Sequence, residues 1–282
     1  MKDKIEKSLY YLNDLDKKLG PIGGHHENVS LHKKGELSYE SYCTEDGISH
    51  VLIHILDNIK MEHKFVLDIG AYSSHGSNAL PVILKHRLPE SQYLLIDGEN
   101  KWQDRSVVKS WIDKDNIASV LEKHGCHKKM DLLSLDIDNM DYWVLRKLME
   151  KKYDANIIAL EFNPIFDHDE SYVKKYKADA RKNDKQTMGT SNYGASLRAF
   201  CELLEEYDYR LVYTITNNAI FIHKRFDTLN QFAILDENMI KFHSKSWVEP
   251  HKVKNNFRIL GTKNLEQLKS IIIENFINLK EG

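Results

Sequence analysis

Cysteine is scarce in this sequence, and the three cysteines that occur are far apart. Cys43, Cys126 and Cys201 form no C-x-x-C pair. An odd number of widely spaced cysteines argues against a disulfide framework or a zinc ribbon as the basis of the fold. The pattern favours a reducing compartment, and we expect a cytoplasmic protein.

Long apolar runs and a surplus of positive charge are also missing. No run approaches the roughly 20 apolar residues of a membrane-spanning helix. The N-terminus, MKDKIEKSLYYLNDLDKKLG, is charged and amphipathic, unlike a signal peptide. The 40 Lys and Arg residues are scattered and balanced by 42 Asp and Glu residues, whereas a nucleic-acid binder gathers its positive charge. We expect neither a membrane span nor a nucleic-acid partner.

What the sequence does contain is typical of a folded domain with extensions at both ends. Of the 282 residues, 41% are hydrophobic and 29% are charged. We expect a helical N-terminal cap at 1–60, a core domain at 61–225 and a C-terminal extension at 226–282 that packs on the core. The apolar spacing over 2–19 and the pattern TEDGISHVLIHILDNI at 44–59 each predict a helix in the cap.

The middle of the chain alternates between short apolar runs and helical patterns. The runs are predicted strands at 65–69, 93–97, 106–112, 131–137 and 156–162. Helical patterns lie between them at about 77–87, 115–124 and 141–151. This alternation predicts βαβ units, and hence a doubly wound α/β domain with a mostly parallel sheet covered by helices on both faces.

The end of the predicted core is a hairpin. Two runs, YRLVYTIT at 209–216 and NAIFIH at 218–223, are nearly contiguous, which indicates a tight turn. Before them, a polar segment at 163–192 is long enough to be a functional loop or lid, and a helix is predicted at 193–206. After them, the chain ends in an amphipathic helix whose apolar face, part of the core or of a homodimer contact, carries Leu265, Leu268, Ile272, Phe276 and Leu279.

A glycine turn follows the first predicted strand in FVLDIGAYSSHGSNAL. Gly70 lets the backbone approach a ligand closely, and the helix that follows directs its N–H groups at the turn. Asp97 ends the next strand, where an acid that binds ribose hydroxyls belongs, although it could instead cap the next helix. Ligands of doubly wound sheets bind beyond the carboxyl ends of the strands. These features predict a nucleoside site, and the lack of a third glycine disfavours a dinucleotide.

Carboxylates gather in the stretch DLLSLDIDNMDYW at 131–143. Asp136 and Asp138 are two residues apart near a strand end, so in a continuing strand they would point the same way. The next strand ends with Glu161 and Asn163, again two apart. Converging carboxylates raise one another's pKa or cost stability unless a cation joins them. Oxygen ligands favour Mg²⁺, Mn²⁺ or Ca²⁺ over zinc, whereas Asp141 is expected to be only the first residue of a helix.

These motifs together resemble class I S-adenosylmethionine-dependent methyltransferases, and most closely the FkbM-like and sugar O-methyltransferase subgroup. The resemblance covers about residues 40–225 and is carried by EDGI at 45–48, Gly70-Ala71, Ser77-Asn78, LLID ending at Asp97, the 131–143 stretch, EFN at 161–163 and GASL at 194–197. Asn139 stands where the subgroup often has Gly, and Asp97 where it often has Glu. The resemblance implies a seven-stranded sheet with an antiparallel hairpin at one edge.

The resemblance also implies a site for S-adenosylmethionine. Its members would be Asp68, Gly70 and Ala71 at the methionine end, Asp97 at the ribose, Ile112 and Asp113 near the adenine, and Ser77 and Asn78 as further polar contacts. By the same analogy, the acceptor is a hydroxyl of a sugar, free or nucleotide-linked, such as one destined for a surface polysaccharide.

Methyl transfer to a hydroxyl gives the carboxylates a role. A hydroxyl is a poor nucleophile until it loses its proton, and a bound Mg²⁺ or Mn²⁺ lowers its pKa while a nearby base takes the proton. We assign Asp136, Glu161 and Asn163 as ligands of the metal or of the acceptor hydroxyls, and Asp138 or His168 as the base. Tyr193, at the start of a predicted helix, could face the acceptor.

Several alternatives remain open at this point. Asp136 could contact the cofactor without a metal, and His168 could be a solvated loop residue. The chain could also be a dinucleotide-dependent sugar oxidoreductase or epimerase, or a cofactor-binding protein without catalysis.

Overall fold

The computed structural model describes residues 48–71, 77–99, 105–178, 192–215, 217–226 and 265–281. The predicted helix at 2–19, Gly76 and most of the 226–282 extension lie outside the described residues. In the part of the chain that the structure describes, no helix is long and apolar enough to cross a membrane.

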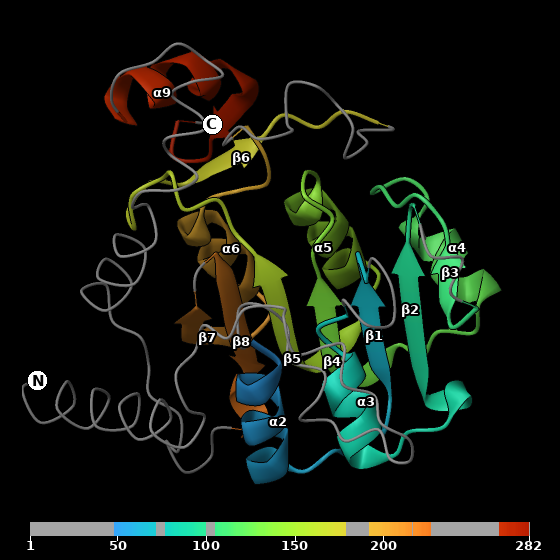
Figure 1. Cartoon of the computed structure of the whole chain (residues 1–282). Helices are drawn as coiled ribbons and strands as arrows, with labels where there is room; N and C mark the ends of the chain where they lie inside the picture. Colours follow the sequence, from blue (N-terminus) through green and yellow to red (C-terminus); the bar gives the residue numbers. More distant parts are fainter. Residues whose placement is uncertain are drawn as a thin grey trace, which may run out of the picture.

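Seven strands form the central sheet (Figure 1). They are β1 (Val66–Ile69), β2 (Tyr93–Asp97), β3 (Val107–Lys109), β4 (Lys129–Leu135), β5 (Asp154–Glu161), β7 (Tyr209–Ile215) and β8 (Asn218–His223). Their order is β3-β2-β1-β4-β5-β8-β7. The strands from β3 to β5 pair in parallel, and β8 is antiparallel to both of its neighbours. The predicted seven-stranded, mostly parallel sheet with an antiparallel hairpin at one edge is confirmed.

Helices cover both faces of this sheet. They are α2 (Ile48–Ile59), α3 (Leu80–His86), α4 (Ile117–Lys123), α5 (Asp141–Glu150) and α6 (Leu197–Glu205), with short 3₁₀ turns η4 (Glu90–Gln92) and η5 (Lys224–Phe226). The helices α2 and α3 pack with one face of the sheet, and α4, α5 and α6 pack with the other. In β1, Val66 packs on the face covered by α2 and α3, and Leu67 and Ile69 pack on the face covered by α4, α5 and α6. This division arises because successive side chains of a strand point to opposite faces of the sheet. The domain is therefore doubly wound, as predicted.

Two strands end earlier than the apolar runs predict. The strand β4 stops at Leu135 rather than at 137. The N–H of Asp136 still donates to Ile69 of β1 (2.9 Å), but the N–H of Ile137 donates to the carboxylate of Asp141 at the start of α5 (2.8 Å). The strand β3 covers only Val107–Lys109 of the predicted 106–112. Beyond it, the Trp111 ring packs directly on Gly98, where an added Cβ would lie 2.3 Å from the ring. Both apolar runs therefore continue past their strands as half-buried, irregular segments.

The C-terminal segment is only partly the predicted helix. The helix α9 (Leu265–Ile272) is followed by η6 (Ile273–Asn275) and by β9 (Phe276–Asn278). The strand β9 pairs antiparallel with β6 (Tyr172–Lys174), inside the segment that was predicted to be a polar loop. Phe276 is nevertheless buried, against Phe166 and its neighbours in a small separate core. The apolar spacing identified Leu268, Ile272 and Phe276 as buried, but pairing with β6 places Phe276 in a strand rather than in the helix.

Candidate functional site at the carboxyl ends of β1, β4 and β5

The strand order places a topological switch point between β1 and β4. The chain continues from β1 to β2 and β3 on one side, and then returns to β4 on the other side of β1. Open α/β sheets bind their ligands beyond the strand ends at such a point. The residues that follow the two strands are Gly70 and Asp136.

Gly70 and Asp136 are in backbone contact. Gly70 has a φ of +95°, and a Cβ added there would lie 1.6 Å from the carbonyl oxygen of Asp136. The amide N–H of Asp136 also donates to the carbonyl of Ile69 (2.9 Å). Only glycine fits this position, because it has no Cβ and adopts a positive φ without strain. The predicted glycine turn and the first predicted carboxylate therefore belong to one site.

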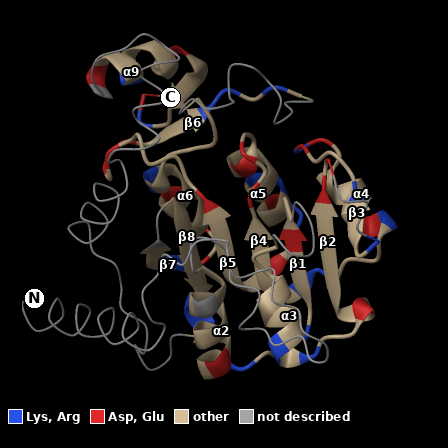
Figure 2. Cartoon of the chain, viewed as in Figure 1, with Lys and Arg blue, Asp and Glu red and all other residues tan. Residues whose placement is uncertain are grey.

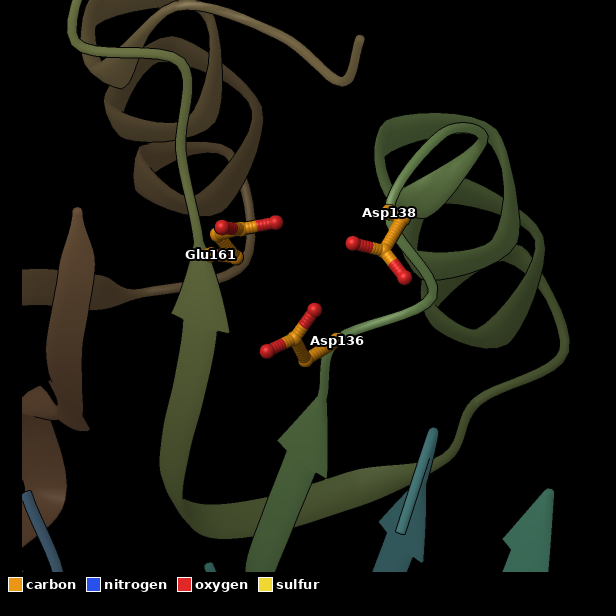
Figure 3. A group of neighbouring side chains, drawn as sticks. All are labelled: Asp136, Asp138 and Glu161. Carbon is orange, nitrogen blue, oxygen red and sulfur yellow. The ribbon is translucent and has the colours of Figure 1, made fainter. Parts of the chain in front are cut away.

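The register between β4 and β5 brings Asp136 and Glu161 together. Leu135 and Leu160 are partners across the two parallel strands, so one residue further along each chain Asp136 lies beside Glu161. Figure 3 shows their carboxylates, with that of Asp138, directed into the same space. One oxygen from each of the three carboxylates lies within 4.8 Å of the other two. The convergence predicted from neighbouring strand ends is confirmed.

Asp138 reaches this space by a different route from the one the sequence predicted. It does not continue the strand, because its φ is +63°, in the left-handed region. The two N–H groups on either side of it, of Ile137 and Asn139, both donate to the carboxylate of Asp141, at 2.8 Å and 3.0 Å. These two hydrogen bonds hold the chain in a reversal around Asp138, which turns its carboxylate back toward Asp136. The alternation expected for a strand at this residue is wrong.

Asp141 begins α5, as predicted, and its carboxylate is buried within the molecule. Burial raises the pKa of Asp141 to about 8, and the charge of Asp136 adds to the shift. The hydrogen bonds that its carboxylate accepts from the backbone N–H groups of Ile137 and of Asp141 itself lower the pKa and act in the opposite direction. Asp141 is therefore a positioning residue for the loop that carries Asp138, which is more than the helix start that the sequence indicated.

Glu161 ends β5 and Asn163 lies two residues beyond it, and the two side chains make different contacts. The side-chain amide of Asn217, in the turn between β7 and β8, donates to Glu161. Asn163 is fully buried; its Nδ2 donates to the carbonyl of Tyr193 (2.8 Å) and its Oδ1 accepts from the N–H of Ile165 (3.1 Å). The amide of Asn163 thus holds the backbone around the site, and its role as a ligand stays a prediction.

The carboxylate of Asp68, assigned to the cofactor, lies buried at the start of α3. It accepts hydrogen bonds from Ser77 Oγ (2.5 Å) and from the N–H of Ala79 (3.3 Å). Ser77 Oγ in turn accepts from the N–H groups of Ala79 and Leu80, both at 3.1 Å. Burial raises the pKa of Asp68. These side chains hold the end of β1 to the first turn of α3, and their contacts with a cofactor stay predictions.

Two more carboxylates assigned to the cofactor accept local backbone N–H groups. Asp97, at the end of β2, accepts from the N–H of Glu99 (2.7 Å). Asp113 accepts from the N–H groups of Asp115 (2.8 Å) and Asn116 (3.0 Å), directly before α4. Figure 2 shows acidic residues at the carboxyl ends of β1, β2 and β5. This edge of the sheet is therefore acidic, and the ribose and adenine roles stay predictions.

The remaining assigned positions lie near the same edge. Ala71 donates its N–H to the carbonyl of Ile96 (3.1 Å). Asn78 Nδ2 donates to Ser134 Oγ (3.5 Å), and Ile112 packs half-buried on the core. These contacts place Ala71 beside β2, Asn78 beside β4 and Ile112 on the core, and their roles at a cofactor stay predictions.

His168 lies in the loop between β5 and β6. Its Nδ1 is 3.8 Å from a carboxylate oxygen of Asp169. Two neighbours in that loop, Ile165 and Phe166, pack on α9. The assignment of His168 as a base stays a prediction, whereas Asp138 lies within the carboxylate cluster itself.

Sequence reasoning missed Asn217 as a partner of the cluster, and it placed Tyr193 only as a residue that could face the acceptor. In the sequence, Asn217 indicated only the tight turn between the two strands of the hairpin. Tyr193 begins the segment before α6, and its hydroxyl is hydrogen-bonded to the side chain of Asn217. Burial raises the pKa of Tyr193, and the negative charges of Glu161 and Asp136 raise it further. Both residues therefore border the carboxylates, although they come from distant parts of the chain.

Comparisons with known proteins give likenesses to solved structures only. No family model matches the chain, and no curated protein matches it. Among solved structures, it is similar to the crystal structure of the N-terminal domain of EvdMO1 with SAH bound, at 9% identity and a TM-score of 0.35. The similarity covers 76% of this chain and 94% of that one. A similarity this low does not indicate a shared activity.

Proposed function

We propose that this chain is an S-adenosylmethionine-dependent O-methyltransferase that acts on a sugar hydroxyl with the help of a divalent cation. One observation carries the proposal. Three carboxylates from the ends of β4 and β5 converge within 4.8 Å of one another, and the first of them is in backbone contact with the glycine turn after β1.

The cofactor half of the site is the edge formed by β1, β2 and β3. Gly70 keeps the turn after β1 free of side-chain bulk, and Asp97 lies at the end of the adjacent β2. A carboxylate at that position can accept both hydroxyl protons of a ribose. The nucleoside would lie along β2 and β3, with the methionine end at Gly70, next to Asp136.

The acceptor half is the edge formed by β4 and β5. Asp136 and Glu161 offer hard oxygen atoms, which suit Mg²⁺ or Mn²⁺. Such a cation, when bound, lowers the pKa of an acceptor hydroxyl. Asn217 holds Glu161 by a hydrogen bond, and Asp141 holds the loop of Asp138. These contacts keep the carboxylates in place before any ligand arrives.

In the proposed reaction, Asp138 acts as the base. The acceptor oxygen forms a bond to the methyl carbon, and the bond between that carbon and the sulfonium sulfur breaks. The hydroxyl proton passes to the carboxylate of Asp138. The products are a methyl ether and S-adenosylhomocysteine.

Isothermal titration calorimetry with S-adenosylhomocysteine, NAD and Mg²⁺ tests the proposal. We expect the wild-type protein to bind S-adenosylhomocysteine and not NAD. The variants Asp136→Asn and Glu161→Gln should still bind S-adenosylhomocysteine but should no longer bind Mg²⁺. At a Mg²⁺ concentration of 100 times its Kd, wild type should gain about 2.7 kcal/mol of stability and both variants none. The exposed carboxylate of Glu122 on α4 supplies the control, Glu122→Gln, which should behave as wild type.

The outcomes separate the parts of the proposal. Binding of NAD without binding of S-adenosylhomocysteine would favour an oxidoreductase and reject methyl transfer. Binding of S-adenosylhomocysteine with no Mg²⁺-dependent gain in stability would reject only the cation.

A further inference from the structure

The carboxylate cluster has a neutral side, which is formed by Tyr193 and Asn217. The Tyr193 hydroxyl is hydrogen-bonded to the side chain of Asn217, and it lies close enough to Glu161, Asp136 and Asp138 for each charge to act on it. The Tyr193 hydroxyl therefore borders the carboxylate cluster.

The backbone on both sides of Tyr193 is fixed. The carbonyl of Tyr193 accepts from Asn163 Nδ2 (2.8 Å), at the end of β5. The next N–H, of Gly194, donates to the carbonyl of Asn139 (3.1 Å), in the loop that carries Asp138. One residue further, Ala195 forms a β-bridge with Val173 of β6. Tyr193 is thus tied to the same two elements that present the carboxylates.

Asn217 is held just as firmly. Its carbonyl accepts from the N–H of Phe162 (2.7 Å), and its amide nitrogen donates to Glu161. That nitrogen carries two hydrogens, so it can serve the Glu161 carboxylate and the Tyr193 hydroxyl together. The hydroxyl then keeps its own proton as a donor for a ligand.

The two sides of the site differ in what they can bind. Ionised carboxylates only accept hydrogen bonds, whereas a phenol and an amide also donate. A hydroxyl group suits both sides, because it donates and accepts. Even with one divalent cation bound, the three carboxylates Asp136, Asp138 and Glu161 leave a net negative charge, which disfavours a phosphate or carboxylate in the same place.

We propose that Tyr193 determines acceptor specificity by binding a second hydroxyl, on the carbon next to the one that is methylated. The acceptor therefore presents an uncharged vicinal diol, with one hydroxyl toward the carboxylates and the other toward Tyr193. The inference rests on the proposed function and narrows its substrate class.

Two probes that differ by one hydroxyl test this inference. They are cis-cyclohexane-1,2-diol and cyclohexanol, titrated by NMR into the protein saturated with S-adenosylhomocysteine and Mg²⁺. Wild type should bind the diol more tightly than the alcohol. Tyr193→Phe keeps the ring and removes the hydroxyl, so it should weaken diol binding about fivefold and leave alcohol binding unchanged. Tyr153→Phe, in a buried tyrosine at the other end of α5, is the control and should change neither.

Each result decides a different point. Equal binding of diol and alcohol by wild type, or full diol affinity in Tyr193→Phe, overturns the inference and leaves methyl transfer standing. A larger fall in melting temperature or in S-adenosylhomocysteine affinity for Tyr193→Phe than for Tyr153→Phe assigns Tyr193 to the fold and also overturns it. Failure of wild type to bind S-adenosylhomocysteine removes the proposed function itself.

Discussion

Replacing Gly70 by alanine tests the contact on which the whole site depends. The substitution adds one methyl group at the point where the turn after β1 passes the end of β4. That Cβ would lie 1.6 Å from the carbonyl oxygen of Asp136, and real Cβ atoms essentially never come within 3.0 Å of another heavy atom. One of the two backbones must therefore move by more than an ångström.

Two costs add up in this variant. An alanine at a φ of +95° loses about 1–2 kcal/mol, because its Cβ crowds the backbone in the left-handed region. Forcing a methyl group into a packed position costs about 1–3 kcal/mol more. We expect Gly70→Ala to lose about 2–5 kcal/mol of unfolding free energy, which lowers the melting temperature by roughly 5–15 °C in a chain of this size.

The functional effect should exceed the effect on stability. Either the glycine turn or Asp136, a proposed ligand, has to move, and a misplacement of about 1 Å in a catalytic site costs on the order of a hundredfold in rate. At a temperature where the variant is still folded, we expect Mg²⁺ to give no gain in stability. S-adenosylhomocysteine affinity, measured by calorimetry, should fall as well.

Gly125→Ala is the matched control. Gly125 also has a positive φ, +67°, but nothing lies within 4 Å of its added Cβ. It should therefore show the backbone cost alone, about 1 kcal/mol, with ligand binding unchanged. Equal losses of stability in the two variants, or full Mg²⁺ binding by Gly70→Ala, would refute the reasoning that joins the turn to the carboxylates.

Two other residues of the site give predictions of their own. Asp138 has a φ of +63°, which asparagine tolerates better than alanine; chemical denaturation should find Asp138→Asn about 1 kcal/mol more stable than Asp138→Ala, and equal stability would show that the turn carries no strain. The pKa of Asp141 is raised to about 8, so between pH 4 and pH 8 the folded protein holds a proton that the unfolded chain releases. The unfolding free energy of wild type, measured in chelator, should therefore fall relative to that of Asp141→Asn as the pH rises through this window, by at most about 1.4 kcal/mol per pH unit. Parallel pH profiles for the two proteins would mean that burial does not shift this carboxyl.

Two aspartates of the stretch 131–143, Asp131 and Asp136, have different structural roles. Asp131 comes before the apolar run, and its carboxylate accepts the N–H groups of Glu62 and His63 and the side-chain amide of Asn156. It therefore braces the beginning of β4, at the opposite end of the strand from Asp136. A residue's position at one end of an apolar run was enough to separate these two aspartates.

The sequence by itself determined the alternation of strands and helices, the glycine turn and the pair of strands that end in acids. These are local patterns, because each depends on residues that are close in the chain, and parallel strands meet at a common edge by geometry alone. Only the tertiary structure decided that Asp138 leaves the strand direction, because the two hydrogen bonds to Asp141 act on backbone conformation. It also brought Tyr193 and Asn217 to the carboxylates, since the hydrogen bonds that hold them join segments far apart in the chain, and no local pattern records such a contact.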